Sequence, residues 1–202
     1  ARFVSNPGCY PTGFLALVAP LIRAGLISAD WPLTVNAVSG YSGGGKALIE
    51  RVEGDPTLAF RDYGFALSHK HVPEMQLHAG LTYAPVFAPT VTRAFRGMIV
   101  EVPLPLAAMP GKPDADAIAN TLSEFFADSR VVTVHGDRPD ELLIDVDAVP
   151  SDRLDLYVFA SPDGGQARLV ATLDNLGKGA SGAAVQSLNI MAGADPHEGL
   201  VL

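Results

Sequence analysis

The chain contains a single cysteine, Cys9, in the segment NPGCYPTG at residues 6–13. A cysteine attacks a substrate only as the thiolate, and the free N–H groups at a helix N-terminus stabilise that negative charge. Apolar residues recur every three or four positions over residues 12–26, and Pro11 is a favourable first-turn residue, so we expect a helix that begins beside Cys9. Gly8 leaves room for a substrate to approach the backbone. These features favour a nucleophile over the alternative, a small buried hydrophobic residue.

Two histidines and a glutamate, His69, His71 and Glu74, form an H-x-H-x-x-E pattern around Pro73, which predicts that a helix begins here. A nucleophilic cysteine usually needs a base, and a histidine beside a helix N-terminus stays neutral because the helix dipole disfavours imidazolium. Two alternatives stay open: a zinc site, for which no further ligands have suitable spacing, and ordinary loop histidines. We expect an acid/base pair and no metal.

A glycine-rich loop, SGYSGGGK at residues 39–46, follows an expected strand. It lacks the phosphate-binding spacing G-x-x-x-x-G-K-[ST], because Ala47 follows the lysine. Its hydroxyls, amides and lysine could hold an anion, or the loop could be a flexible hairpin. Two later arginines could clamp a carboxylate or phosphate with both guanidinium nitrogens, or could be exposed without such a role. The candidate substrate contacts are Ser39, Tyr41, Lys46, Arg93 and Arg96.

A second glycine-rich segment, LDNLGKGASGAAVQ at residues 173–186, precedes an expected helix. Asn175, Lys178 and Gly179 thus lie at a helix start, a place suited to anions or to close contact with a cofactor. The segment is not a G-x-G-x-x-G sequence after an N-terminal strand, and no such dinucleotide fingerprint occurs anywhere in the chain.

The elements that position these residues are predicted from hydrophobic periodicity. Strands are expected at 33–39, 61–67, 83–87, 98–104, 131–135, 154–160 and 168–173. Helices are expected at 12–26, after the first glycine-rich loop as far as residue 52, from Pro73, at 114–128 and at 180–191. This order indicates an α/β (α+β-like) fold: a mixed, largely antiparallel sheet with helices packed mainly on one face.

The composition describes a folded domain with a substantial core, since 48% of the 202 residues are hydrophobic and 18% are charged. The net charge of −8 and the lack of a basic run disfavour a nucleic-acid partner. No apolar stretch reaches the roughly 18–20 residues that span a membrane. One cysteine cannot form an internal disulfide framework, so we expect a cytoplasmic protein.

Six motifs occur in an order that resembles the N-acetyl-gamma-glutamyl-phosphate reductase family, particularly its shorter bacterial class. They are NPGCYPTG, VSGYSGGGK, HKHVPEM, FAPTVTRAFRGM, VEVPL and LDNLGKGASGAAVQ, and they extend from residue 6 to residue 186. The related aspartate-semialdehyde dehydrogenases share some of them. The H-x-H-x-x-E pattern after the SGYSGGGK loop distinguishes the two families. The resemblance implies a catalytic domain of the semialdehyde-dehydrogenase or glyceraldehyde-phosphate-dehydrogenase type.

The resemblance also implies an activity: NADPH-dependent reductive dephosphorylation of N-acetyl-glutamyl 5-phosphate to the 5-semialdehyde, in arginine biosynthesis. Cys9 would form a thioester with release of phosphate, and a hydride would reduce it. His69 would be the acid/base with His71 as its substitute, and Glu74 would orient the histidines or contact substrate. The remaining assignments are Ser39, Tyr41, Lys46, Arg93 and Arg96 to the substrate, and Gly8, Asn175 and Gly179 to the cofactor.

Family members begin with a nucleotide-binding half, whereas this chain begins just before the cysteine motif. We expect residues 1–178 to be a catalytic and dimerisation domain of a homo-oligomer, and residues 179–202 to pack on the absent half. Alone, the chain should bind NADPH poorly and lack reductase activity. The alternatives are an aspartate-semialdehyde-dehydrogenase-like reductase, a Cys/His acyl hydrolase or transferase without a redox cofactor, and a non-catalytic oligomerisation domain.

Overall fold

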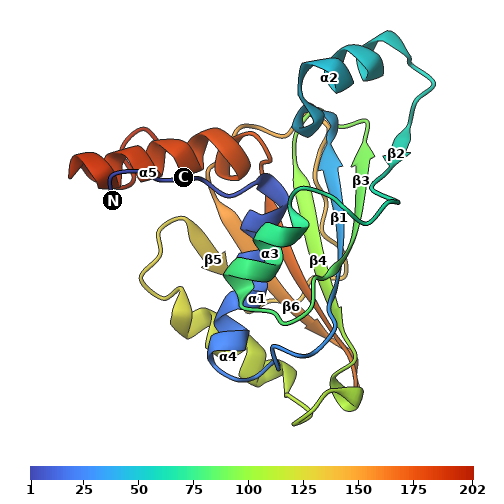
Figure 1. The fold of residues 1–202 in the computed structure, drawn as a ribbon, viewed down its shortest axis with the longest axis vertical. Coiled ribbons are helices and arrows are strands. Elements are labelled where there is room, and N and C mark those ends of the chain that lie inside the picture. Colours follow the sequence, from blue (N-terminus) through green and yellow to red (C-terminus); the bar gives the residue numbers. More distant parts are fainter.

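The computed structural model describes all residues, 1–202, and a seven-stranded mixed sheet forms its centre (Figure 1). The strand order is β2-β3-β1-β4-β7-β6-β5. The strands are β1 (Thr34–Gly40), β2 (Phe60–Asp62), β3 (Val86–Thr92), β4 (Met98–Leu104), β5 (Val132–Val134), β6 (Leu154–Ala160) and β7 (Ala167–Leu173). The pairs β1–β3 and β5–β6 are parallel and the other four are antiparallel. The predicted mixed, largely antiparallel sheet is confirmed.

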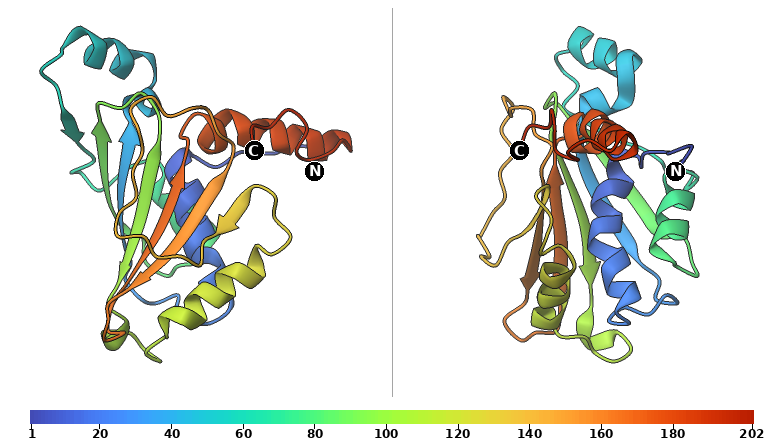
Figure 2. Two further views of the ribbon diagram at one scale, coloured as in Figure 1. Left: turned by 180° about the vertical axis from the view of Figure 1, so that it is seen from behind. Right: turned by 90° about the vertical axis from the view of Figure 1, so that its left-hand side faces the viewer.

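Three helices cover one face of this sheet, as predicted (Figure 2). Helix α1 contacts β4 and β7, α3 packs on α1, and α4 packs on α1 and β6. Helix α2 lies apart from this layer, and α5 projects from the body of the fold (Figure 1). The helices are α1 (Cys9–Arg23), α2 (Gly45–Gly54), α3 (Val72–Ala79), α4 (Ala115–Phe125) and α5 (Gly182–Ala192). Shorter turns are the 3-10 segments Tyr41–Gly44 and Leu106–Ala108 and the π-helical turn Gly177–Ser181.

The main core lies between α1 and the central strands. In β4 every second side chain is buried, from Met98 to Leu104, because alternate residues of a strand point to the same face. These side chains join Phe14 of α1 in one cluster of 32 buried residues. Gly13 permits the close approach of helix and sheet, since a Cβ atom there would lie 3.0 Å from Val100 Cβ. Helix α1 is therefore packed closely on the sheet, and this packing fixes the position of Cys9, the first residue of the helix.

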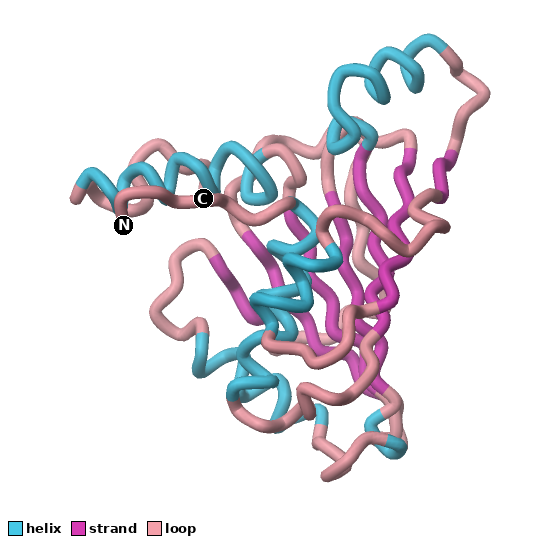
Figure 3. The backbone as a smooth tube through the Cα atoms, in the orientation of Figure 1, coloured by secondary structure: helices cyan, strands magenta, loops and turns pink.

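The connection between β5 and β6 crosses the opposite face of the sheet without regular secondary structure over most of its length (Figures 2 and 3). Ile144 in this connection packs on Gly97, where a Cβ atom would lie 2.4 Å from Ile144 Cγ2. Gly97 also has a φ of 99°, a backbone conformation that favours glycine. The connection thus supports the turn between β3 and β4 from the side opposite the helices.

The strand expected at 61–67 is shorter than predicted and ends at Asp62. The chain turns directly afterwards, with Gly64 and Leu67 at φ angles of 80° and 54°. The apolar residues Phe65 and Leu67 continue the alternating pattern of a strand past this turn, although both side chains are exposed on a loop. The pattern therefore predicted a strand that is too long.

The strand expected at 83–87 is displaced toward the C-terminus and runs from Val86 to Thr92. Its parallel pairing with β1 continues to the last residue of both strands and extends the ladder past Pro89. In contrast, the strands predicted at 98–104 and 154–160 have the predicted bounds.

The N-terminal segment lies along one side of α5 and the C-terminal segment along the other (Figures 1 and 2). The Ser187 hydroxyl donates a hydrogen bond of 2.7 Å to Asn6 Oδ1. Apolar side chains of α5 stay exposed, among them Leu188 and Ile190, at 63% and 60%. No helix is long and apolar enough to cross a membrane.

Candidate active site

Cys9 is the first residue of α1, and Gly8 precedes the helix with extended backbone angles. The predicted helix that begins beside Cys9 is confirmed. No side chain caps its N-terminal end. Burial raises the pKa of the Cys9 thiol above its usual value, while the N–H groups of Tyr10 and Cys9 and the charge of Lys70 oppose that shift. The helix end therefore acts in the predicted direction, but desolvation of the thiolate is the larger effect.

Glu74 holds the backbone immediately before the nucleophile. It lies in the first turn of α3, and its Oε1 atom accepts a hydrogen bond of 3.0 Å from the Gly8 N–H. This contact joins α3 to the start of α1 across 66 residues of sequence. Glu74 thus positions the residue next to Cys9, a role different from the predicted orientation of the histidines.

His71 packs directly on Gly8. A Cβ atom built on Gly8 would lie 2.3 Å from His71 Nε2, so only glycine leaves room for this ring. Burial, followed by the charges of His69 and Lys70, lowers the pKa of His71 to about 4. Its Nδ1 atom is buried and has no hydrogen-bond partner. His71 is consequently neutral near pH 7, and its Nδ1 atom forms no hydrogen bond within the chain.

His69 lies beside His71, with ring centroids 4.8 Å apart. Its Nδ1 atom accepts a hydrogen bond of 3.2 Å from the His71 backbone N–H. In the neutral ring the proton is therefore on Nε2. Burial, and then the charge of Lys70, lowers the pKa of His69 from its usual value.

Two tyrosines that the sequence analysis did not single out form an aromatic wall around the histidines. Tyr10 is buried, and its ring lies 6.1 Å from His69 and 5.8 Å from His71. The Tyr63 hydroxyl donates a 3.2 Å hydrogen bond to the Tyr10 hydroxyl. Burial raises the pKa of both phenols, so both stay protonated. The position of Tyr10 directly after the nucleophile is the signal that could have identified it.

Gly179 forms the opposite wall of the nucleophile site. A Cβ atom there would lie 2.8 Å from Cys9 Cβ, and the Gly179 N–H donates to the Asp174 carbonyl at 2.9 Å. This late segment, which the resemblance assigns to the cofactor, thus lies directly against the nucleophile. Gly8 and Gly179 are thus the two glycines that allow His71 and the late segment to pack closely around Cys9.

Asn175 is only 2% exposed, and both polar atoms of its amide are used within the chain. Its Oδ1 accepts from the Gly97 N–H at 3.0 Å, and its Nδ2 donates to the Ser42 hydroxyl at 2.9 Å. The side chain therefore joins the two glycine-rich segments and the turn before β4. This geometry makes Asn175 a support of the site, where the sequence suggested a cofactor contact.

The two arginines predicted to clamp an anion also have partners inside the chain. Arg96 Nη1 forms an ion pair of 2.9 Å with Asp174 Oδ2. Arg93 Nη1 donates to the carbonyls of Asp55 and Leu58 at 2.7 and 3.1 Å, which anchors the connection from α2 to β2. These guanidinium groups stabilise turns near the site.

The candidates on the first glycine-rich loop do not gather around the thiol. The Lys46 side chain is 89% exposed on α2, 3.7 Å from Glu50. The Tyr41 hydroxyl lies 3.4 Å from Glu53, also on α2. Ser39 is buried, and its hydroxyl donates to the Gly40 carbonyl at 3.0 Å. Of the three, Ser39 alone is buried in the body of the fold.

Lys70 is a cation at the site that the sequence patterns did not mark as a candidate. It lies between the two histidines, is exposed, and forms no ion pair within the chain. Its charge lowers the pKa of Cys9, His69 and His71. Its place inside the H-x-H pattern was the available signal.

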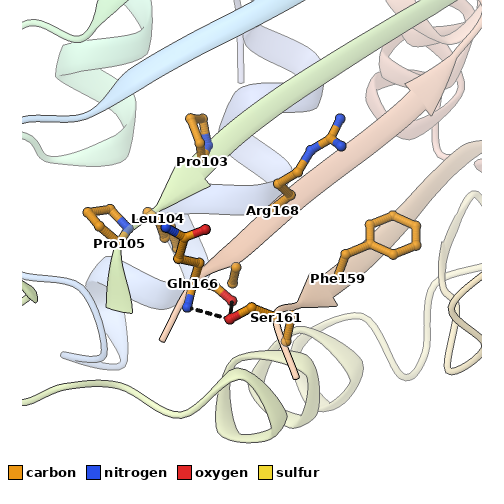
Figure 4. A pocket seen from close by; sticks show the side chains of 9 residues that line it. Pro103, Leu104, Pro105, Phe159, Ser161, Gln166 and Arg168 are labelled. Carbon is orange, nitrogen blue, oxygen red and sulfur yellow. Dashed lines mark hydrogen bonds between the residues drawn. The ribbon is translucent and has the colours of Figure 1, made fainter. Parts of the chain in front are cut away.

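A cavity of about 440 Å³ lies at the far end of the sheet and contains no candidate nucleophile or base (Figure 4). It is lined by Pro103, Leu104, Pro105, Phe159, Ala160, Ser161, Gln166, Ala167 and Arg168. Arg168, its one charged side chain, is paired with Glu101. The cavity lies at the beginning of β7, whereas Gly179 and Cys9 lie beyond its end, about 20 Å away at ~3.3 Å per residue.

The match to a protein family gives the class to which this cysteine site and this sheet belong. The chain belongs to the semialdehyde dehydrogenase, dimerisation domain family, whose profile matches residues 9–175. N-acetyl-gamma-glutamyl-phosphate reductase of Brucella ovis is 51% identical over 201 residues, which covers 96% of this chain and 65% of the relative. The protein of the same name from Brucella canis matches to the same extent. The predicted resemblance is confirmed, and the chain spans about two thirds (65%) of the relatives' length.

Solved structures share the fold. Aspartate semialdehyde dehydrogenase II from Vibrio cholerae superimposes with a TM-score of 0.63 at 18% identity, over 94% of this chain and 62% of that one. A probable aspartate-semialdehyde dehydrogenase from Pseudomonas aeruginosa gives 0.63 at 19% identity, over 93% and 62%. At these identities the likeness concerns the fold alone.

Proposed function

We propose that this chain is the catalytic part of an NADP-dependent oxidoreductase that converts N-acetyl-glutamyl 5-phosphate to N-acetyl-glutamate 5-semialdehyde in arginine biosynthesis. The observation that carries this proposal is the enclosure of Cys9 at the start of α1, between the segment from His69 to Glu74 and Gly179. The 51% identity to N-acetyl-gamma-glutamyl-phosphate reductases supports the choice of substrate.

In the proposed reaction the Cys9 thiolate attacks the acyl carbon, the bond from that carbon to the phosphate oxygen breaks, and phosphate leaves with the electron pair. A thioester on Cys9 results. Because burial favours the protonated thiol in the resting site, a neighbouring base must take the proton during attack. Both histidines are neutral near pH 7, since burial lowers the pKa of each.

The two histidines differ in which ring nitrogens are already hydrogen-bonded. His69 already uses Nδ1 as an acceptor, so its free Nε2–H is arranged to donate a proton. His71 Nδ1 has no partner, and its Nε2 lies against Gly8, the neighbour of the nucleophile. We therefore assign His71 to accepting the thiol proton and His69 to protonating the oxygen of the thiohemiacetal, which divides between them the role that the resemblance gives to His69.

Lys70 is the cation that faces the leaving phosphate in this proposal. The two candidate arginines bind other groups of the chain, Arg96 the Asp174 carboxylate and Arg93 two backbone carbonyls. An unpaired ammonium beside the thiol stabilises both the thiolate and the phosphate that leaves it.

A nicotinamide cofactor, when bound, would supply the hydride that reduces the thioester. Gly8 and Gly179 are assigned to it from the resemblance; in this chain Gly8 packs against His71 and Gly179 against Cys9, so both backbones lie next to the nucleophile. NADP is inferred from the resemblance. No dinucleotide fingerprint occurs in residues 1–202, so most of the cofactor's contacts would belong to a nucleotide-binding half.

The remaining assignments extend this proposal. Residues 1–178 would form a catalytic and dimerisation domain, and residues 179–202 would pack on the nucleotide-binding half through the exposed apolar side chains of α5, such as Leu188 and Ile190. A homo-oligomer is supported by the dimerisation domain in the family's name. A cytoplasmic location and the absence of nucleic-acid partners fit a chain with a net charge of −8 and one cysteine.

The first half-reaction tests the proposal without any cofactor. The purified chain is mixed with N-acetyl-glutamyl 5-phosphate and, separately, with aspartyl phosphate, while phosphate release and intact mass are followed. We expect a burst of one phosphate per chain with the N-acetyl compound, an acyl group on Cys9, and no burst in Cys9→Ser. Continuous turnover to the free acid would support an acyl hydrolase instead, and a preference for aspartyl phosphate would support the related dehydrogenase.

A further inference from the structure

The π-helical turn Gly177–Ser181 is held between two different surfaces. On one side Gly179 touches Cys9, as described above. On the other side lies Asp152, which is 7% exposed and belongs to none of the motifs that drew attention in the sequence. A Cβ atom on Gly182 would lie 1.8 Å from Asp152 Oδ1, and one on Gly177 would lie 3.0 Å from the same oxygen. The carboxylate therefore fits against the back of the turn, where only glycine leaves room for it.

Asp152 is itself fixed by two hydrogen bonds to one residue near the C-terminus. Its backbone N–H donates to the Val201 carbonyl at 2.8 Å, and its Oδ2 accepts from the Val201 N–H at 2.9 Å. Its neighbour Ser151 accepts the Lys178 N–H at 3.2 Å. One carboxylate oxygen thus binds the C-terminal segment while the other supports the turn.

We infer that Asp152 is a positioning residue for the nucleophile site: by filling the space behind the π turn, it keeps Gly179 in contact with Cys9. The inference rests on the proposed acyl transfer at Cys9. The charge of Asp152 also stabilises the protonated Lys178 ammonium within the same turn, opposing the burial that lowers the pKa of that lysine. Without the carboxylate, Gly179 can withdraw from Cys9, which exposes the thiol and leaves the acyl group less well oriented.

The test compares variants of Asp152 and Val201 in the purified chain. Asp152→Ala removes the carboxylate, and Val201→Pro removes the N–H that binds Oδ2 while it keeps the Val201 carbonyl that accepts from the Asp152 N–H. The matched controls are Asp152→Asn, which keeps the shape and one acceptor, Val201→Ala, which keeps the N–H, and Asp147→Asn on the exposed connection to β6. Folding is checked by circular dichroism and thermal unfolding.

Two rates are measured: alkylation of Cys9 by iodoacetamide as a function of pH, and the burst of phosphate from N-acetyl-glutamyl 5-phosphate. We expect Asp152→Ala and Val201→Pro to alkylate about threefold faster at pH 7, with the midpoint at lower pH, because a less buried thiol ionises more readily. We expect their burst at saturating substrate to slow about tenfold with little change in half-saturation. The three controls should stay within about twofold of the parent chain, well below a one-unit pKa change.

The inference is overturned if both variants fold and keep the parent's alkylation profile and burst rate, even when their melting temperatures fall. If Asp152→Ala does not fold, Val201→Pro alone decides the outcome in the same way. If the parent chain gives no burst, the proposed function fails, but the alkylation profiles still show whether Asp152 controls the surroundings of Cys9.

Discussion

The two glycine-rich segments of this chain differ in what their glycines touch. In the second segment Gly179 meets Cys9, and Gly177 and Gly182 meet the Ser151–Asp152 backbone and carboxylate. In the first segment Gly40 meets the Phe95–Arg96 backbone, but Gly44 meets only Leu48 of the helix that follows, and Gly45 has no neighbour within 4 Å of where its Cβ would be. That helix is supported mainly by a cluster of three buried residues. Glycine content alone therefore does not define a site. Glycines packed against distant parts of the chain, such as Gly40 and Gly179, mark the enclosed region, whereas Gly44 and Gly45, with a local neighbour or none, mark the start of an exposed arm.

Among substitutions in the two glycine-rich segments, we expect the largest effect on the phosphate burst at Gly179. Gly179→Ala would place a methyl group 2.8 Å from Cys9 Cβ, so the nucleophile or the turn must move. We expect the phosphate burst to fall about a hundredfold, the usual cost of displacing a reacting group by ~1 Å. Gly54→Ala at the end of α2, where a Cβ meets nothing within 4 Å, is the control and should keep the parent's burst. An unimpaired burst in Gly179→Ala would show that close packing between residue 179 and Cys9 is not needed for the reaction.

The link between the two segments is expected to matter for stability. Asn175→Ala leaves the Gly97 N–H and the Ser42 hydroxyl without their partner in a buried site. We expect the free energy of unfolding to fall by about 2–3 kcal/mol, as measured by urea denaturation. Asn36→Ala, on the exposed side of β1, should change it by less than about 0.5 kcal/mol. Equal losses for the two variants would mean that the amide is not a structural link.

His71 gives the enclosed region a pH dependence. Its pKa is lowered from 6.5 to about 4, so below pH 6.5 the unfolded chain binds a proton that the folded chain rejects. The contribution of neutral His71 to the free energy of unfolding is therefore fully present above pH 6.5 and is lost as the pH falls toward 4. The loss amounts to about 2 kcal/mol after allowance for solvent screening. His71→Gln should flatten this part of the curve in urea titrations. His78→Gln, on the exposed side of α3, should leave the slope as it is.

Opposite charges beside Cys9 should move its alkylation profile in opposite directions. Lys70 lowers the pKa of the thiol and Glu74 raises it. Lys70→Gln should therefore shift the alkylation midpoint to higher pH and Glu74→Gln to lower pH, each changing the rate at pH 7 about threefold. Shifts in the same direction would indicate that the variants act by rearranging the site instead of through charge.

The smallest effect is expected on the exposed arm. Lys46→Gln removes a cation whose side chain is 89% exposed and paired loosely with Glu50. The burst rate and its half-saturation should stay within about twofold of the parent, because exposed ion pairs contribute little. A tenfold weaker half-saturation would place Lys46 at the substrate and would overturn the contrast between the two segments.

Local signals in the sequence were sufficient for the mixed sheet as a class, the number of helices and the start of α1, because Pro11, Pro73 and alternating strands such as β4 report directly on local structure. They misplaced β2 and β3, whose ends are set by a turn and by pairing with β1. The motif order also identified the family. Partners distant in sequence could not be found in this way: Glu74 with Gly8, Asn175 with Ser42, and Arg96 with Asp174. Charged and amide side chains look alike in a sequence whether they face a substrate or hold a turn, and only the fold distinguishes them.

The π turn before α5 also has a consequence for chain length. A π turn contains more residues than an α-helical turn of the same height, and each α-helical residue adds about 100° of rotation. Deleting one residue from Gly177–Ser181 would let the turn close as an ordinary helical turn, and because either kind of turn completes about one rotation, α5 would keep nearly the same direction relative to β7. The same deletion within α5 would instead rotate the residues after it by about 100° and turn Val185 or Leu188 away. The π turn is therefore the place before the last helix where the chain can change by one residue without redirecting its apolar side.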